Sequence, residues 1–441
     1  MLVEVTDDRL VRADLAGDRE GMNVADRTHL PVPEPDLTEA ELVERAVALR
    51  PVLLERQQET ERLTRYPPAT HEDFLRAGFY RTLQPRLYGG YEFGLPTFYR
   101  VVVEISRGCP STGWALSLVS AHVLQFASLF GEQVQTEVFG ADGEFRAAST
   151  VMPIGVAQPD GDGHYILDGT WPYSSGAPYS THYVGQTLLA PEKEGDPPGP
   201  MLLFVAPRSA WTVVDDWYGT LGLRGSGSNS IRIDRSRIPA RLTFPASLLD
   251  LPVEGGTPGS RLHGNPMYAG RAASFFHGEL ASFMVGTAYA AADEYASIIA
   301  NRPLATDPGR TRAELPDYQR YLGQALAKIS TAEAALHGAA EEYMEVCRRN
   351  ASGEAPFTLA EDDRLAAVFL TAGQLAWEAL HNILYRTAGS RHARDGARMQ
   401  RYFRDGATYL SHVAPNMADP LAQRIGSARV GLPFDHIPLV T

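Results

Sequence analysis

Cysteine is almost absent from this 441-residue sequence, which contains only Cys109 and Cys347. Two cysteines exclude a disulfide framework and any zinc site built from several thiolates. Long apolar runs are also missing, because tracts such as Met201–Pro207 are far shorter than the roughly 20 residues that cross a bilayer. The first residues are acidic and lack the apolar segment and cleavage site of a secretory signal. We therefore expect a cytoplasmic protein with no membrane partner.

Positive charge is scarce as well, with 40 Lys and Arg against 53 Asp and Glu and a formal net charge of −13. Nucleic acids are bound by clustered basic side chains, so we expect no nucleic-acid partner. The P-loop, H-E-x-x-H, Rossmann and G-x-S-x-G signatures are all missing. The 12 histidines show no metal-ligand spacing, so we expect no metal site.

What is present is typical of a folded protein, with 44% apolar and 21% charged residues. The length predicts two or three domains or one long unit of several layers. Residues 1–36 are charged, contain prolines and have no sustained hydrophobic period, so we predict a flexible N-terminal arm.

Residues 37–145 have the pattern of an N-terminal helical domain. Thr38 and Glu41 form a capping box, which predicts the start of a helix. We expect Pro51 to kink or restart that helix, and Gly78 to end the next one. Residues 111–130 are apolar with few charges, which indicates a buried helix.

Residues 146–255 change to short runs rich in Val, Ile, Thr, Tyr and Trp, separated by turn residues, which predict a small β-barrel or sandwich. Residues 256–441 return to long helical patterns and predict a C-terminal four-helix bundle. Because strands and helices do not alternate, we expect an α+β fold that is mainly α. The alanine-rich faces of residues 281–301 and 330–340 predict a homotetramer assembled through this bundle.

Three segments contain residues that are candidates for ligand binding or catalysis. Residues 169–180, GTWPYSSGAPYS, place rings and hydroxyls between two predicted strands, and residues 221–233, LGLRGSGSNSIRI, offer donors to an anion or a heterocycle. Residues 106–117, SRGCPSTGWALS, are explained by helix capping. Considered alone, the glycine- and serine-rich segment also fits an ordinary turn, and His122 and His412 fit packed core histidines.

Taken together and in order, these segments resemble one family. RLYGGYEFGLPTF, SRGCPSTGW, LDGTWPYSSGAPYSTHYVGQ, WYGTLGLRGSGSNSIRIDRSRIPA and QRYFRDGATYLSH are similar to segments of the acyl-CoA dehydrogenase-like flavin monooxygenases, over roughly residues 40–425. The resemblance implies a helical N-terminal domain, a central β domain and a C-terminal bundle. It further implies that FMNH₂ or FADH₂, supplied by a separate NAD(P)H-dependent flavin reductase, reacts with O₂ and a small-molecule substrate.

The resemblance also assigns site residues. Flavin contacts are implied for the W-P-Y-S-S-G segment, for residues matching the loop that closes over the ring, and for a phosphate-binding arginine: Trp171, Ser174, Ser175, Ser149, Arg224, Ser226, Ser228 and Arg271. Catalytic roles are implied for His122, His412 and Ser175, with the two histidines beside substrate and flavin. Neutral histidine suits hydrogen bonding and proton transfer near neutral pH.

Hydroxylation of a small phenolic, otherwise aromatic or polyketide-like compound through a flavin hydroperoxide is the activity that the resemblance implies. N-oxygenation of an amine, such as a nucleotide-linked amino sugar, is an alternative within the same family. Acyl-CoA dehydrogenation is another, although Gly396 stands where those enzymes have a glutamate base, eight residues before Arg404. Adjacent Asp395 could replace that base. A non-catalytic scaffold would not explain the grouped hydroxyls and histidines.

Overall fold

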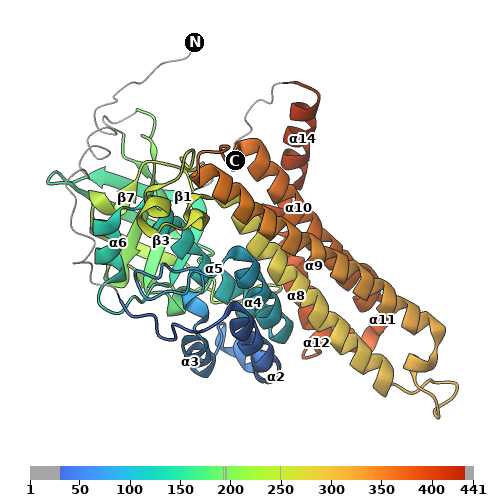
Figure 1. Cartoon of the computed structure of the whole chain (residues 1–441). Helices are drawn as coiled ribbons and strands as arrows, with labels where there is room; N and C mark the ends of the chain where they lie inside the picture. Colours follow the sequence, from blue (N-terminus) through green and yellow to red (C-terminus); the bar gives the residue numbers. More distant parts are fainter. Residues whose placement is uncertain (1–29, 192, 194–195, 249, 433–441) are drawn as a thin grey trace.

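The computed structural model describes residues 30–191, 193, 196–248 and 250–432. Figure 1 shows a first group of helices beside a sheet and an elongated helical bundle that extends away from both. The first helices are α2 (Glu39–Leu63), α3 (Pro68–Ala77), α4 (Leu95–Gly108), α5 (Pro110–Leu129) and α6 (Glu132–Phe139). Most of the predicted N-terminal arm lies outside the described residues.

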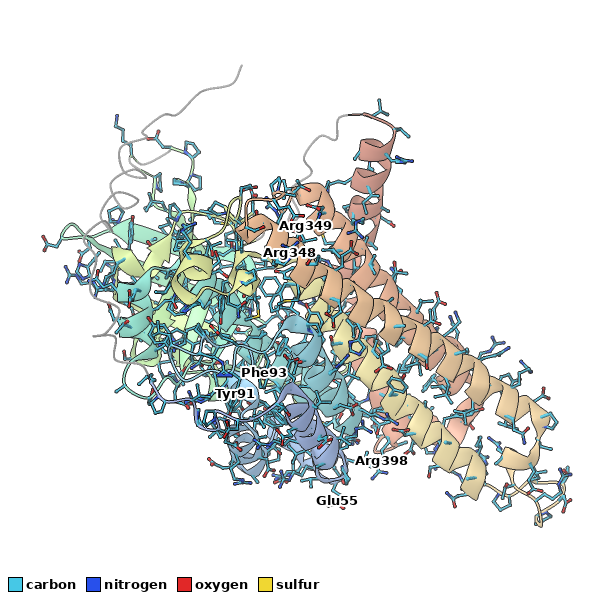
Figure 2. The ribbon with its side chains drawn as sticks, in the orientation of Figure 1. Glu55, Tyr91, Phe93, Arg348, Arg349 and Arg398 are labelled. Carbon is cyan, nitrogen blue, oxygen red and sulfur yellow. The ribbon has the colours of Figure 1, made fainter. Side chains whose placement is uncertain are left out.

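The start of α2 and the end of α3 follow the sequence signals. The Glu41 amide donates to Thr38 Oγ1 at 3.2 Å and the Thr38 amide donates to Glu41 Oε2 at 2.9 Å, which confirms the capping box. Gly78 ends α3 with φ +82°, and a Cβ there would lie 2.7 Å from the ring of Tyr91. Tyr91 and Phe93, labelled in Figure 2, stack with ring centroids 5.4 Å apart before α4.

The predicted restart at Pro51 is wrong, because α2 is continuous from Glu39 to Leu63, and a kink there stays a prediction. Leu42 and Ala46 before the proline, and Leu53 after it, are buried against the N-terminal core. Burial on both sides of Pro51 stabilises one continuous helix and outweighs the loss of the backbone hydrogen bond that proline removes.

The described strands form one mixed sheet of seven strands in the order β5-β6-β2-β1-β3-β4-β7. Within the described part of the chain, β1 and β3 are the one parallel pair of strands, and the other paired strands are antiparallel. The sheet therefore has two separate edges, at β5 and β7, rather than the closed barrel or paired sheets expected from the strand spacing. The strands are β1 (Ala147–Pro159), β2 (His164–Trp171), β3 (His182–Leu189), β4 (Met201–Pro207), β5 (Thr212–Val213), β6 (Ile231–Pro239) and β7 (Thr243–Phe244).

The C-terminal helices form the predicted bundle, in which α8, α9 and α10 pack on one another and α12 packs on α8. A π-helical turn, η8 (Ala379–Tyr385), continues α10 into α11. The helices are α7 (Pro258–His263), α8 (Ala272–Asn301), α9 (Pro316–Ala351), α10 (Leu359–Glu378), α11 (Arg386–Ala388), α12 (Arg398–Leu410), α13 (Val413–Asn416) and α14 (Ala418–Arg429). No helix in the described part of the chain is long and apolar enough to cross a membrane.

Helix α5 connects the parts of the molecule, because it packs on β1, α4 and α8. Nearly all of its side chains are buried, as the apolar pattern predicted. Several alanines of α8 and α9 are buried within the chain, and Ala281, Ala288 and Ala340 have no exposed surface, whereas Ala300 and Ala334 are exposed. The buried alanines contribute nothing to a free apolar face, and the homotetramer stays a prediction.

Candidate active site

A cavity of about 440 Å³ lies where α5, the sheet and the bundle meet. Its walls come from α5 and β1, from the turn at Tyr173 and Ser175, from the loop between β5 and β6, and from α8 and the α12–α14 segment. Apolar side chains contribute most of the wall, and a few hydroxyls and imidazoles contribute the rest. This size and composition are typical of a small-molecule site. We call it the central cavity.

A chain of hydroxyl groups follows one wall of the central cavity. Trp114 Nε1 donates to Ser175 Oγ at 3.0 Å, Ser175 Oγ lies 2.7 Å from Ser228 Oγ, and Ser228 Oγ lies 2.6 Å from Ser226 Oγ. Ser226 Oγ donates to the Leu223 carbonyl at 2.8 Å. Since each serine has one hydroxyl hydrogen, the chain runs from Trp114 toward Leu223 and uses all of those hydrogens. Ser175 and Ser228 therefore present acceptor oxygens to the cavity.

The loop that carries these serines is fixed to the bundle. The Leu223 amide donates to buried Asp405 Oδ1 at 2.7 Å, and Arg404 Nη1 donates to the Leu221 carbonyl at 2.9 Å. Gly222 packs so closely on the Arg404 carbonyl that a Cβ there would collide with it. Burial raises the pKa of Asp405 to about 6. Arg404 and Asp405 of α12 thus position the serine loop over the cavity.

His122 lines the cavity from α5. Its Nδ1 lies 2.8 Å from the Ala147 carbonyl, and because a carbonyl only accepts, Nδ1 carries the hydrogen. In the neutral ring, Nε2 is then an acceptor. Burial lowers the pKa of His122 to about 4, so the ring is neutral at physiological pH.

The hydrogen-bonding pattern of the His412 ring is the opposite of that of His122. It lies in the turn between α12 and α13, and its Nδ1 accepts from the Ala414 amide at 3.2 Å. The neutral ring therefore carries its hydrogen on Nε2, which is a donor. Burial lowers the pKa of His412 to about 4. Its ring packs edge-on to Trp114 with centroids 5.4 Å apart, which connects it to the hydroxyl chain. One cavity thus contains an imidazole acceptor and an imidazole donor.

Comparison with known proteins gives concordant results. The model of the acyl-CoA dehydrogenase N-terminal domain matches residues 41–140, and that of the C-terminal domain matches residues 279–417. The chain is 31% identical over 397 residues to a flavin-dependent monooxygenase, oxygenase subunit HsaA, of Rhodococcus jostii, covering 89% of this chain and 99% of that protein. It is 28% identical over 424 residues to the FADH₂-dependent resorcinol hydroxylase, oxygenase component, of Rhizobium sp., covering 92% and 98%. The crystal structure of 3-HSA hydroxylase from Rhodococcus sp. RHA1 is similar with a TM-score of 0.80 at 27% identity, covering 90% and 98%.

The chain belongs to the flavin-dependent monooxygenases with the acyl-CoA dehydrogenase fold. This confirms the resemblance, the α+β fold class and the prediction of an oxidoreductase that uses reduced flavin and O₂.

The central cavity of this monooxygenase fits a flavin ring. The hydroxyl chain offers acceptor oxygens, and the mostly apolar walls suit a flat heterocycle. Thr408 also lines the cavity, and its buried Oγ1 has no hydrogen-bond partner among the described residues. A buried hydroxyl without a partner is costly, so a ligand atom there would satisfy it. Ser175, Ser228 and Thr408 are the residues that would hold the polar edge of the ring.

The structure brings together some of the catalytic and flavin-binding residues that were predicted from the sequence. Five of them line the central cavity: His122, Ser149, Ser175, Ser228 and His412.

The other residues that were predicted to contact flavin do not line the central cavity. Trp171 is fully buried in the sheet core, where its Nε1 donates to the Gln186 carbonyl at 2.9 Å. Ser174 Oγ donates to the Trp171 carbonyl at 3.1 Å, and Arg224 Nε donates to the Thr220 carbonyl at 3.0 Å. Ser226 supports Ser228. These four residues shape the turn and loop, and their contact with flavin stays a prediction.

Arg271 also lies away from the cavity lining. It precedes α8, forms an ion pair with Glu254, and donates from Nε to the Phe357 carbonyl at 2.6 Å. Its assignment to a flavin phosphate stays a prediction. Asp395, the carboxylate considered as a dehydrogenase base, is exposed and accepts from Gln400 Nε2 at 3.0 Å. It does not line the cavity, so nothing in its position supports acyl-CoA dehydrogenation.

Several cavity residues were missed in the sequence. Trp114 was explained only by its place in a helix, and Thr408 and His277 had no motif of their own. Glu279 had a signal: it is the only charged residue between Ala272 and Ala292 of α8. A single carboxyl in a long apolar helical segment indicates a buried functional group.

Proposed function

We propose that this monooxygenase hydroxylates a small phenol. The observation that carries the proposal is the pair of neutral histidines with opposite hydrogen-bonding polarity in one largely apolar cavity. His122 Nε2 accepts a hydrogen bond from the phenol hydroxyl and orients the ring. His412 Nε2 donates toward the oxygen atoms that react. The resorcinol hydroxylase similarity supports a phenol, since resorcinol is one.

Bound reduced flavin supplies the electrons that activate O₂. The chain's own residues position the reactants and exclude water. Acceptor oxygens at Ser175 and Ser228 favour a ring that offers an N–H, and the reduced flavin ring has one that the oxidised ring lacks. We therefore expect reduced flavin to bind more tightly than oxidised flavin. The apolar walls keep water from the reacting atoms, which prevents wasteful release of hydrogen peroxide.

Replacing each of the two histidines should have a different effect on the reaction. His412→Ala should still bind reduced flavin and consume O₂, but release hydrogen peroxide in place of product, because the donor near the reacting oxygens is lost. His122→Ala should raise the Kd of the phenol by about tenfold, the worth of a hydrogen bond of about 1.4 kcal/mol, with peroxide release nearly unchanged when substrate is absent.

The measurements are product yield per O₂ consumed and anaerobic titration of each variant with the phenol in the presence of reduced flavin. His164→Ala is the matched control, because His164 is a half-buried histidine of β2 outside the cavity lining. If both active-site variants lose thermal stability equally and keep the yield of product per O₂, the histidines are packing residues and the proposal fails. Identification of an N-oxygenated product from an amine would favour the alternative chemistry.

The same reasoning supports a partner. Oxygenase components receive reduced flavin from another protein, so we propose a separate NAD(P)H-dependent flavin reductase.

We also propose a homotetramer and a cytoplasmic location. Trp377, Tyr385 and Phe403 form a half-buried aromatic set on the bundle, with Tyr385 and Phe403 stacked at 4.1 Å, and such a surface favours association. Light scattering that shows a monomer at micromolar concentration would contradict the tetramer.

A further inference from the structure

Glu279 lines the central cavity and has no role in the function proposed above. Its side chain is fully buried on α8, and neither of its carboxyl oxygens has a hydrogen-bond partner among the described residues. Buried carboxyl groups are ordinarily paired or hydrogen-bonded. A carboxyl group left without either, in the wall of a ligand cavity, is available to a ligand.

Among the described residues, no cation compensates the charge of Glu279. Burial alone raises its pKa well above the usual range, and no positive neighbour lowers it. Arg424 of α14 also lines the cavity, but its guanidinium is paired with Asp363. Tyr99 of α4, His277 of α8 and His412 are also titratable and close to this part of the cavity. Burial raises the pKa of the tyrosine, which keeps it neutral, and lowers the pKa of both histidines, which disfavours their cationic form.

Glu279 lies within reach of a ligand bound at His122. The ring of Phe276 lies 5.6 Å from the ring of His122, and Glu279 is three residues after Phe276 on the same helix. Side chains three residues apart on a helix are neighbours, with Cβ atoms about 5–6 Å apart. A phenol whose hydroxyl binds His122 can therefore extend along Phe276 and place its far end at Glu279.

We propose that Glu279 binds a protonated amine at the end of the substrate remote from the phenol hydroxyl. An ammonium group brings both the opposite charge and several N–H donors for two unsatisfied oxygens, whereas a neutral hydroxyl brings one donor. A phenol with a carboxylate at that end brings no donor for these oxygens and adds an uncompensated negative charge to a dry cavity, so the site disfavours it. This inference rests on the proposed phenol hydroxylation and names its substrate class.

The test uses three phenols of matched shape: tyramine, 4-ethylphenol and 3-(4-hydroxyphenyl)propionate. Each is titrated anaerobically into the protein loaded with reduced flavin. The wild type should bind tyramine about tenfold more tightly than 4-ethylphenol, as expected for a charge-assisted hydrogen bond, and bind the propionate most weakly. Glu279→Gln should abolish this order by weakening tyramine binding about tenfold while changing the Kd of 4-ethylphenol by less than about threefold.

A second readout separates binding at Glu279 from a change in packing. An ammonium ligand lowers the raised pKa of the carboxyl, so tyramine binding should release a proton. Calorimetry in two buffers of different ionisation enthalpy measures that proton, which should be absent for 4-ethylphenol and for tyramine with Glu279→Gln. Glu294→Gln is the control, because Glu294 lies on the same helix outside the cavity lining and pairs with Arg398.

Equal binding of the three phenols by the wild type, uniform weakening by Glu279→Gln, or no proton release would overturn the inference. The wild-type comparison of the three phenols decides the question even where the variant does not fold. Hydroxylation of phenols without any charge preference would leave the proposed function standing and remove the role of Glu279. Tyramine binding that depends on Glu279 but yields no hydroxylated product would support the role of Glu279 and contradict the proposed phenol hydroxylation.

Discussion

Replacing Asp405 by alanine should loosen the serine loop of the active site. Asp405 is fully buried in α12, and its carboxylate accepts from the Leu223 amide at 2.7 Å and from Ser111 Oγ at 3.3 Å. The Leu223 carbonyl in turn ends the hydroxyl chain that reaches Ser175. Asp405 is therefore the link through which the bundle holds the wall of the central cavity.

The cost of Asp405→Ala follows from these contacts. A buried amide left without an acceptor costs about 1–3 kcal/mol, and loss of the packed side chain adds to it. Against this, removing a buried carboxylate relieves its own desolvation, which is considerable because burial raises its pKa to about 6. We expect a net loss of about 2 kcal/mol in the free energy of unfolding and about a tenfold weaker affinity for reduced flavin. Asp405→Asn keeps an acceptor oxygen for Leu223 and should lose less than half as much.

Urea unfolding gives the free energy, and anaerobic titration with reduced flavin gives the affinity. Asp395→Ala is the control, because Asp395 lies exposed just before α12 and should change neither quantity. The reasoning is refuted if Asp405→Ala unfolds and binds reduced flavin like the wild type. If Asp405→Asn is as damaging as Asp405→Ala, the charge rather than the Leu223 hydrogen bond is what matters.

Two further predictions concern the same cavity. Gly176 has φ +70°, and a Cβ there would collide with Val119 of α5, so Gly176→Ala should destabilise the fold by about 2 kcal/mol in urea unfolding and weaken reduced-flavin binding; unchanged binding would contradict this. For His122, burial lowers the pKa from 6.5 to about 4, so between these values the unfolded chain binds a proton that the native chain does not, and stability falls as pH falls. The stability of the wild type relative to His122→Asn should thus decrease by roughly 3 kcal/mol from pH 6.5 to pH 4, and unfolding curves with a constant difference would contradict it.

Local signals in the sequence predicted much of the fold because they act over a few residues. The capping box at Thr38 and the positive-φ glycine at Gly78 are such signals, and both are confirmed. The sheet order was not accessible in this way. β1 pairs with β3 in parallel and with β2 in an antiparallel manner, and these pairings depend on contacts between distant segments rather than on the pattern of any one strand.

The active site was only partly predictable for a related reason. His122 and His412 have no distinctive local pattern, and only the family resemblance selected them from other buried histidines. The polarity of each ring depends on its neighbour in space, the Ala147 carbonyl or the Ala414 amide, which the sequence does not display. Asp405 lies within the segment QRYFRDGATYLSH that carried the resemblance, but its hydrogen bond to Leu223 joins residues that are distant in the sequence and exists only in the folded chain.

The low pKa of His122 also decides what this residue can do for a phenol. A phenol loses its proton with a pKa of about 10 in water, whereas burial lowers the pKa of His122 to about 4. Full proton transfer between them before reaction would be uphill by roughly 8 kcal/mol, and the apolar walls disfavour the resulting charges unless they stay in contact. A hydrogen bond from the phenol to Nε2 requires no separated charge. His122 is therefore best suited to orient the phenol and to accept its proton only as the ring gives up electron density to the incoming oxygen.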